Sequence, residues 1–239
     1  MDKSHTDTLS PSDATGALVA AATFSADEMK AEGIFTAVCT GPRDCDRAHY
    51  LLLTQQIAAI EASNFIKRIT TKGLHQQLKH ELAQIPLEEK WVDVFPNTVT
   101  TVGKNLAFNT FLAGSAYTVT GPYMGLIGAT PTTVIGDTMT SHAGWTEVGG
   151  VNAPQYTAPR KTVAWNAASG GSISNSTALT FSIITTAGTV GGAFICYGSG
   201  AVSTIDNTGG TLWSAGAFTG GNRAVNPGDT LTVSYSVSM

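Results

Sequence analysis

The sequence predicts a mainly β protein, an antiparallel β-sandwich or jelly roll preceded by an extended N-terminal arm and a short α-helical hairpin. Charged residues are only 13% of the 239 residues, and glycine contributes 26, whereas globular domains average about 25% charged residues. Apolar and polar residues alternate with a period of two in the C-terminal part, as in half-buried strands. Clusters of Gly, Asn and Pro separate these segments and supply turns.

Charge and glycine content divide the chain near Pro96. Residues 1–96 carry nine Lys/Arg, thirteen Asp/Glu and four Gly, whereas residues 97–239 carry four Lys/Arg, four Asp/Glu and twenty-two Gly. A shift of this kind marks two structural regimes. We therefore predict an extended N-terminal arm over 1–24, a helical region with a hairpin over 25–96 and a β-sandwich domain over 97–239.

The arm has few large apolar residues, so it cannot order by itself. We expect it to order against a neighbouring subunit, and a flexible terminus is the alternative. Ser25 and Glu28 match a capping box, which predicts a short helix ending near Gly33.

A helical hairpin is predicted from two runs of apolar residues at helical spacing. The first run covers residues 47–69, Gly73 is expected to break it, and the second run ends before Pro86. The second run carries Leu74, Leu78, Leu82 and Ile85. Residues 91–95 then form an aromatic-rich connector that pins the hairpin to the next domain, with ordinary core packing as an equal alternative.

The clearest predicted strand is at the C-terminus, where an apolar set alternates with Ser and Thr. This set is Leu231, Val233, Tyr235, Val237 and Met239. Further strands are predicted over 98–102, 107–112, 117–120, 123–127, 162–165, 179–183, 190–197 and 211–214.

Enzymatic chemistry finds little support in the sequence. His142 is the only histidine of the β domain, and a triad with Asp137 or Glu147 has no nucleophile elbow to complete it. Asp206 and Asp229 lie in turn sequences that explain them without the paired carboxylates of a glycosidase. We therefore expect a protein that is not an enzyme.

We also expect neither a metal nor a cofactor. Cys39, Cys45 and His49 lack the knuckle spacing and the fourth ligand of a structural zinc site, so loop thiols are the preferred interpretation. Phosphate-binding glycine motifs are absent from the sequence. The net charge of −4 argues against nucleic-acid binding, and no apolar run approaches the roughly 20 residues of a membrane span. Three cysteines in a chain of this size fit a reducing compartment.

Four segments resemble virion structural proteins of tailed bacteriophages: Tyr123–Ile127, Gly136–Val148, Gly209–Ser214 and Gly228–Val233. The resemblance implies a β-rich, non-enzymatic virion component, and within that group we favour a capsid decoration or cement protein. It further implies the major capsid protein as partner and a place on the capsid surface after synthesis in the bacterial host cytoplasm. Because a sandwich leaves sheet edges that a neighbour must cover, we also expect self-association as a homo-oligomer, with a trimer favoured.

The mechanism expected for such a protein is a clamp. The β domain sits on the outer capsid surface, and the arm and hairpin hold adjacent major capsid subunits. Partner contacts are predicted at Trp91, Phe95, His142 and Trp145. The alternative is a tail or fibre component that contacts the host surface, with Trp145, Trp213 and Tyr156 stacking on sugars unless these aromatics fill the core instead.

Overall fold

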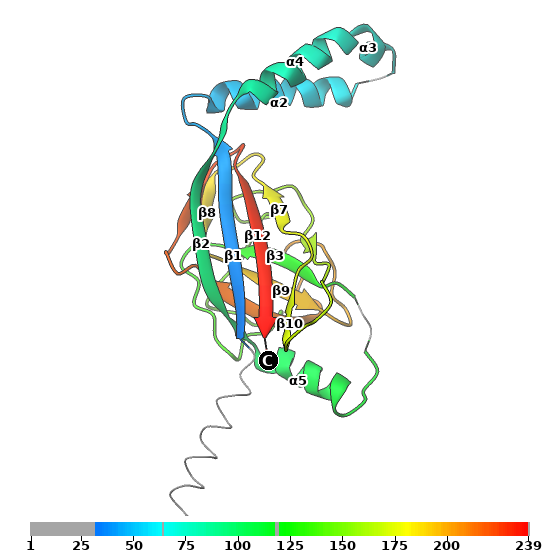
Figure 1. Ribbon diagram of the computed structural model, residues 1–239, viewed down its shortest axis with the longest axis vertical. Helices are drawn as coiled ribbons and strands as arrows, with labels where there is room; N and C mark the ends of the chain where they lie inside the picture. The colour runs from blue at the N-terminus through cyan, green and yellow to red at the C-terminus, as the bar shows by residue number, and fades with distance from the viewer. Residues whose placement is uncertain (1–31, 64, 118–119, 239) are drawn as a thin grey trace, which may run out of the picture.

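The computed structural model describes residues 32–63, 65–117 and 120–238, so the predicted arm of residues 1–24 lies outside the described residues. An elongated β body carries a helical hairpin at one end and a short helix at the other (Figure 1). The body consists of antiparallel strands, which confirms the mainly β fold class.

The described part of the chain contains three long strands and a series of shorter strands and helices. They are β1 (Glu32–Pro42), α2 (Arg47–Glu61), α3 (Phe65–Thr70), α4 (Lys72–Gln84), β2 (Leu87–Val99), α5 (Thr101–Phe111), β3 (Tyr123–Ile127), β4 (Glu147–Val148), β5 (Lys161–Thr162), β6 (Ser172–Ser174), β7 (Leu179–Ser182), β8 (Gly188–Val190), β9 (Gly192–Tyr197), β10 (Thr211–Ala217), β11 (Arg223–Val225) and β12 (Thr230–Ser238).

One sheet runs through ten strands in the order β4-β3-β9-β10-β2-β1-β12-β6, with β5 added to β3 and β7 added to β12. The long strand β2 joins its two halves, because residues up to Asn97 pair with β1 whereas Thr98 and Val99 pair with β10. Strands β8 and β11 form a separate pair. Among the described residues no sheet closes on itself, so the sandwich or jelly roll of the prediction is not confirmed.

The two halves of the sheet share one hydrophobic core. Phe35 of β1 stacks on Phe95 of β2 with ring centroids 5.2 Å apart, and Tyr235 of β12 packs on Phe35 at 4.6 Å. The Tyr235 hydroxyl accepts hydrogen bonds from Trp213 Nε1 of β10 and Asn97 Nδ2 of β2, both at 3.0 Å. A buried hydroxyl with two donors fixes how the two halves meet.

Strand β12 confirms the alternation expected at the C-terminus. Leu231, Val233, Tyr235 and Val237 are buried, and the intervening residues are less so; the predicted Met239 lies outside the described residues. Strand β3 has the predicted bounds, and β7 buries Phe181. The predicted strand over 190–197 is split by Gly191 between β8 and β9. The one over 162–165 is reduced to the end of β5.

The predicted helical region of residues 25–96 is wrong at both of its described ends. Residues 32–42 form β1, with Gly33 inside it, and the expected boundary at Pro96 falls within β2. The predicted helix after Ser25 otherwise lies outside the described residues. Strand β1 was hidden because its outward residues Ile34 and Val38 are as apolar as its buried ones, which removes the contrast between faces.

Helices α2 and α4 form the predicted hairpin, with α3 at its tip (Figure 1). Leu53, Ile57, Ile60 and Leu78 make its small core. Gly73 does not break the helix as predicted but lies in the first turn of α4, where a Cβ would meet nothing. The hairpin ends as expected before Pro86, which cannot continue a helix.

Helix α5 takes the place of most of two predicted strands. The strand predicted over 98–102 is confirmed only at Thr98 and Val99, the end of β2, and the one predicted over 107–112 is helical through Phe111. The Thr100 hydroxyl caps the helix by accepting from the Gly103 amide at 3.1 Å. Gly103 lies against Trp213 of β10, where a Cβ would come within 2.8 Å of the Trp213 carbonyl oxygen. The Thr100 cap and the close packing of Gly103 on Trp213 together fix the position of the first turn of α5 on the body. The predicted strand over 117–120 is absent at Tyr117 and Thr120, the two of its residues that the structure describes.

Candidate functional site

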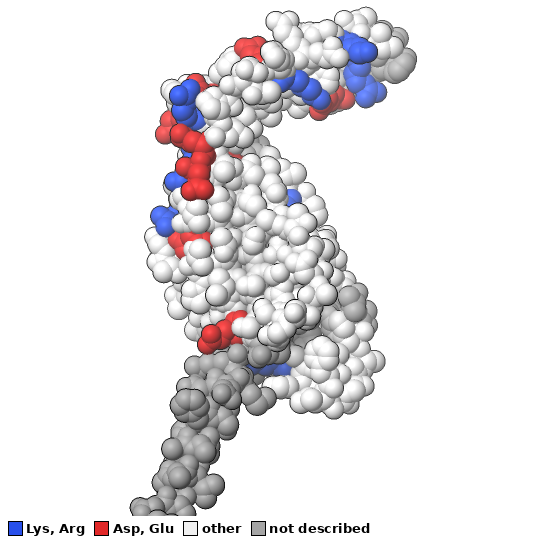
Figure 2. All heavy atoms as spheres, in the orientation of Figure 1, with Lys and Arg blue, Asp and Glu red and all other residues white. Residues whose placement is uncertain are grey.

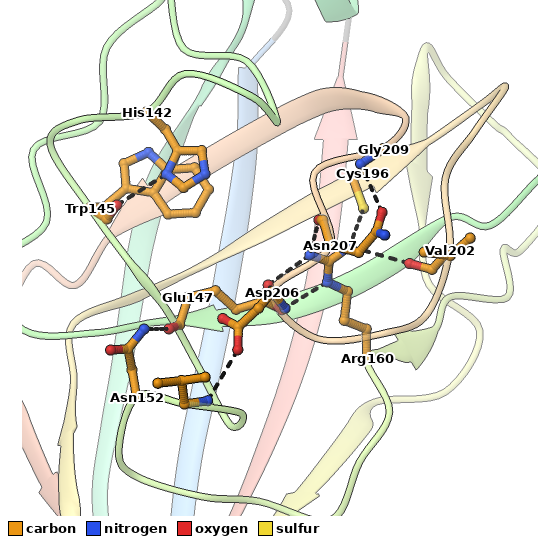
Figure 3. Close-up of polar contacts among 11 residues, drawn as sticks. His142, Trp145, Glu147, Asn152, Arg160, Cys196, Val202, Asp206, Asn207 and Gly209 are labelled. Atoms are coloured by element: carbon orange, nitrogen blue, oxygen red, sulfur yellow. Dashed lines mark hydrogen bonds and ion pairs between the residues drawn. The ribbon is translucent and has the colours of Figure 1, made fainter.

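Arg160 and Glu147 form a buried ion pair inside the body (Figure 3). Arg160 Nε donates to Glu147 Oε1 at 2.7 Å, and Nη2 donates to Oε2 at 2.6 Å. The side chains are 1% and 6% exposed. Burial opposes the positive charge of Arg160, but the hydrogen bonds and charge of Glu147 outweigh that effect and raise the pKa of Arg160.

The remaining donors of Arg160 bind the loop between β9 and β10. Nη2 donates to the Asn207 carbonyl at 2.6 Å, and Nη1 donates to the Val202 carbonyl at 3.2 Å. Glu147 in turn accepts from the Asp206 amide at 2.8 Å. Asp206 has a φ of 65°, a left-handed conformation that Asp tolerates better than most residues. The ion pair therefore holds this loop against β4, and the hydrogen-bonding groups of Arg160 and Glu147 are occupied by these structural contacts.

His142 and Trp145 lie next to this pair (Figure 3). Their rings stack with centroids 3.8 Å apart, and His142 Nδ1 lies 3.0 Å from the Trp145 carbonyl oxygen. Trp145 is 5% exposed and donates from Nε1 to Asp137 Oδ2 at 2.9 Å. Both acids of the considered triad are thus already engaged, Asp137 by this indole and Glu147 by Arg160.

Two hollows flank the cluster. One of about 170 Å³ is lined by His142, Trp145, Asn152, Asp206 and Thr208 among others. It is smaller than the roughly 300 Å³ at which small-molecule sites begin. The other, of about 390 Å³, is open and lies between the segments around Lys161 and Leu179. Its lining contains no carboxylate, so it offers no pair of acids for glycoside hydrolysis.

Of the four predicted contact residues, Phe95 is fully buried and Trp145 nearly so. Neither side chain is placed to touch a partner, which corrects that prediction for both. Trp91 is partly buried in β2, where it packs on Phe218 at 5.6 Å; core packing was the alternative for this segment. His142 is partly exposed at the smaller hollow.

The aromatics proposed for sugar stacking are also core residues. Trp145, Trp213 and Tyr156 are 5%, 6% and 1% exposed. The alternative that they fill the interior is the one the structure favours.

The cysteines lie apart in the fold. Cys39 is buried in β1, whereas Cys45 is exposed in the turn before α2, and all three cysteines are free. Burial raises the pKa of Cys39 to about 12 and that of Cys196 to about 11, so both thiols stay protonated and unreactive at neutral pH. The described part of the chain has no group of three or more His, Cys, Asp or Glu side chains that could hold a metal ion.

The sequence did not predict that most charged side chains of the body form hydrogen bonds or ion pairs within the fold. Asp93 of β2 is 5% exposed and accepts from the Thr219 and Gly220 amides and from Arg223. Asp229 is 1% exposed and pairs with Arg47 at 3.0 Å, and it accepts from the Asn226 amide as its turn position predicts. Arg160 is likewise buried. The scarcity of charge after Pro96 was the available signal, because a rare charge in a core is normally paired.

The far end of α5 is the most exposed apolar surface of the body. Phe108, Phe111 and Leu112 are 52%, 82% and 80% exposed. Single exposed apolar residues are ordinary, but three large ones on one projecting helix end are typical of a contact surface. We call these three residues the α5 patch. Sequence reasoning missed it because residues 107–112 were assigned to a strand.

The surface charge is concentrated at the opposite end. Charged side chains gather on the hairpin and at its junction with the body, whereas the face of the body in Figure 2 is almost uncharged. The outward sides of β1 and β2 also carry exposed Ile34, Val92 and Val94. The molecule thus presents a nearly uncharged body face between the end that carries the α5 patch and the end where most surface charge gathers.

Comparisons of the chain with protein-family models, curated protein sequences and solved structures find no match. Within the described residues, no helix has both the length and the hydrophobicity that crossing a membrane requires.

Proposed function

We propose that this chain is a non-enzymatic virion structural protein that decorates and stabilises a bacteriophage capsid by linking neighbouring subunits. The observation that carries the proposal is the pair of exposed surfaces at the two ends of a β body whose face is almost uncharged. The α5 patch lies at one end and the hairpin at the other (Figure 1). The virion setting comes from the resemblance of the C-terminal segments to phage structural proteins.

The separation of the two ends suits a linking role. Strand β1 has 11 residues, and at about 3.3 Å per residue it spans roughly 35 Å. Its first residues pair with the end of β2, four residues before α5 begins, and its last residue pairs with Leu87 at the hairpin base. A body of this length can contact two subunits of a shell at once, and weak contacts made together act multivalently.

The described groups support a binding rather than a catalytic role. Glu147 and Asp137 are committed to Arg160 and Trp145, and the buried thiols have raised pKa values. The α5 patch, by contrast, is unburied apolar surface, whose removal from water on docking stabilises a complex by about 25 cal/mol per Å². Binding to assembled shells but not to free subunits would stabilise the shell by mass action.

The test uses the full chain and empty shells prepared from the major capsid protein of the same virion. We expect the chain to sediment with the shells and to raise their disruption temperature. The double variant Phe111→Ser/Leu112→Ser should lose both effects, and the control Val134→Ser/Val151→Ser, which removes exposed apolar side chains elsewhere, should keep them. Absence of binding by the unaltered chain, or equal binding by both variants, contradicts the proposal.

A further inference from the structure

The tip of the hairpin is basic and apolar at the same time. Residues 62–80 contain four Lys/Arg and no Asp or Glu. Arg68 and Lys72 are exposed, and beside them Ile69 and Leu74 are 58% and 50% exposed. We call Arg68, Ile69, Lys72 and Leu74 the tip patch. No salt bridge among the described residues uses Arg68 or Lys72.

The base of the hairpin has the complementary character. Leu87, the first residue of β2, is 57% exposed and is followed by exposed Glu88 and Glu89. We call these three residues the base patch. Within the described chain, neither glutamate forms a salt bridge. Acidic side chains, with a few basic ones beside them, gather at this junction in Figure 2, on the flank opposite the basic tip.

The two patches of one molecule cannot meet. Helix α4 begins at Lys72 of the tip patch and ends at Gln84, just before the base patch, and at about 1.5 Å per residue it holds Lys72 about 18 Å from the base. The packing of α4 on α2 through Leu78 and Ile57 keeps this spacing fixed. The basic and apolar tip patch is therefore complementary to the acidic and apolar base patch, but the two patches of one molecule cannot contact each other.

We infer that the tip patch of one molecule docks on the base patch of a second copy of this chain. The hairpin lies across the end of the body, so its tip and base are on opposite flanks of the molecule (Figure 1). Copies standing side by side then meet tip to base. When two copies meet in this way, the pair still has one unoccupied tip patch and one unoccupied base patch. Adding further copies through the same contact gives either a closed ring or an open row. A ring of three copies would be the trimer favoured from the sequence.

The two kinds of residue in the patches have different roles. Exposed ion pairs contribute at most about 1 kcal/mol each, so the burial of Ile69, Leu74 and Leu87 supplies much of the binding. The charges select the pairing, because tip against tip or base against base brings like charges together. The association should consequently weaken as ionic strength rises.

The inference rests on the proposed function and adds to it a contact between copies of this chain, but it is tested without any shell. Sedimentation of the purified full chain measures self-association. The tip variant Arg68→Glu/Lys72→Glu and the base variant Glu88→Lys/Glu89→Lys should each weaken association about tenfold or more. The combination of all four substitutions restores opposite charges and should recover association to within a few fold of the unaltered chain.

Controls separate this contact from general effects of charge. Glu32→Lys with Lys104→Glu changes charge at the other end of the body and should leave association unchanged. Circular dichroism and unfolding temperature report whether each variant folds like the unaltered chain. A monomeric unaltered chain, single-patch variants that associate normally, or a combined variant without recovery would each overturn the inference. A monomer that still binds shells leaves the proposed function standing, whereas an oligomer that does not bind them contradicts that function alone.

Discussion

The β body and the helical hairpin use charged residues in opposite ways. In the body, Arg160, Glu147 and Asp229 are at most 6% exposed and hold loops and strands together. In the hairpin, the Lys79–Glu61 pair is half exposed on both sides, and the interior is a small apolar cluster. Charge in the body therefore serves folding, whereas charge on the hairpin is available for recognition.

The largest effect should come from breaking the buried pair. Arg160→Met leaves the Glu147 carboxylate buried without its partner and removes the bonds to the β9–β10 loop. We expect the free energy of unfolding to fall by about 3–5 kcal/mol, measured by urea denaturation. The neighbouring substitution Lys161→Met is the control, with an expected loss of about 1 kcal/mol or less. A loss below about 1 kcal/mol for Arg160→Met would mean that the pair is not structural.

A core substitution in the hairpin should act locally. Leu78→Ala removes one of the four buried side chains of the hairpin core, at a cost of about 2–3 kcal/mol. Because that core is separate from the one in the body, amides of residues 47–84 should exchange with solvent roughly 30- to 150-fold faster. The amides of β12 should not change, and the exposed-site control His80→Ala should leave both regions protected. Equal loss of protection in β12 would show that hairpin and body unfold together.

The regions also differ in how far the sequence could predict them. Strand β12 and the hairpin were predictable, because each has a clean contrast between buried and exposed residues at the period of its element. Strand β2 reverses that contrast, with Asp93 buried and Val94 57% exposed. Its acid is tolerated inside only because Arg223 and two backbone amides, all far along the chain, bind it. No local pattern carries that information.

Two of the four predicted contact residues, Phe95 and Trp145, are buried for a related reason. Large aromatic residues suit a contact surface, but they are also what a core requires. Helix α5 depends on a cap by Thr100 and on the fit of Gly103 against Trp213, which is a tertiary contact. Once residues 107–112 were assigned to a strand, the exposed α5 patch could not be recognised.

Alkaline pH should weaken the body through its buried thiols. Cys39 and Cys196 have an ordinary pKa of 9.0 when unfolded and raised values of about 12 and about 11 when folded. Their stabilising effect is complete below pH 9 and is lost above it, because the unfolded chain then releases protons that the folded chain keeps. The free energy of unfolding should fall by up to about 1.4 kcal/mol per pH unit for each thiol.

Urea denaturation at pH 8, 9 and 10 measures this slope. The variant Cys196→Ala should have a shallower slope than the unaltered chain, and Cys45→Ala, which changes the exposed thiol beside the hairpin, should keep the original one. The buried tyrosines Tyr156 and Tyr235, whose pKa values burial also raises, contribute equally to both variants. Identical slopes for the two variants would contradict the role of the Cys196 thiol.

The smallest effect should be at the hairpin's own ion pair. Lys79 Nζ lies 2.8 Å from Glu61 Oε1, a shorter contact than the 3.0 Å pair of Arg47 and Asp229, yet its side chains are about half exposed. Lys79→Met should leave the free energy of unfolding unchanged within the error of the measurement, because solvent and salt screen the pair. Arg160→Met, measured in the same buffer, is the matched comparison, because both variants replace a basic side chain by methionine. If Lys79→Met cost as much as Arg160→Met, burial would not be what distinguishes the charges of the body from those of the hairpin.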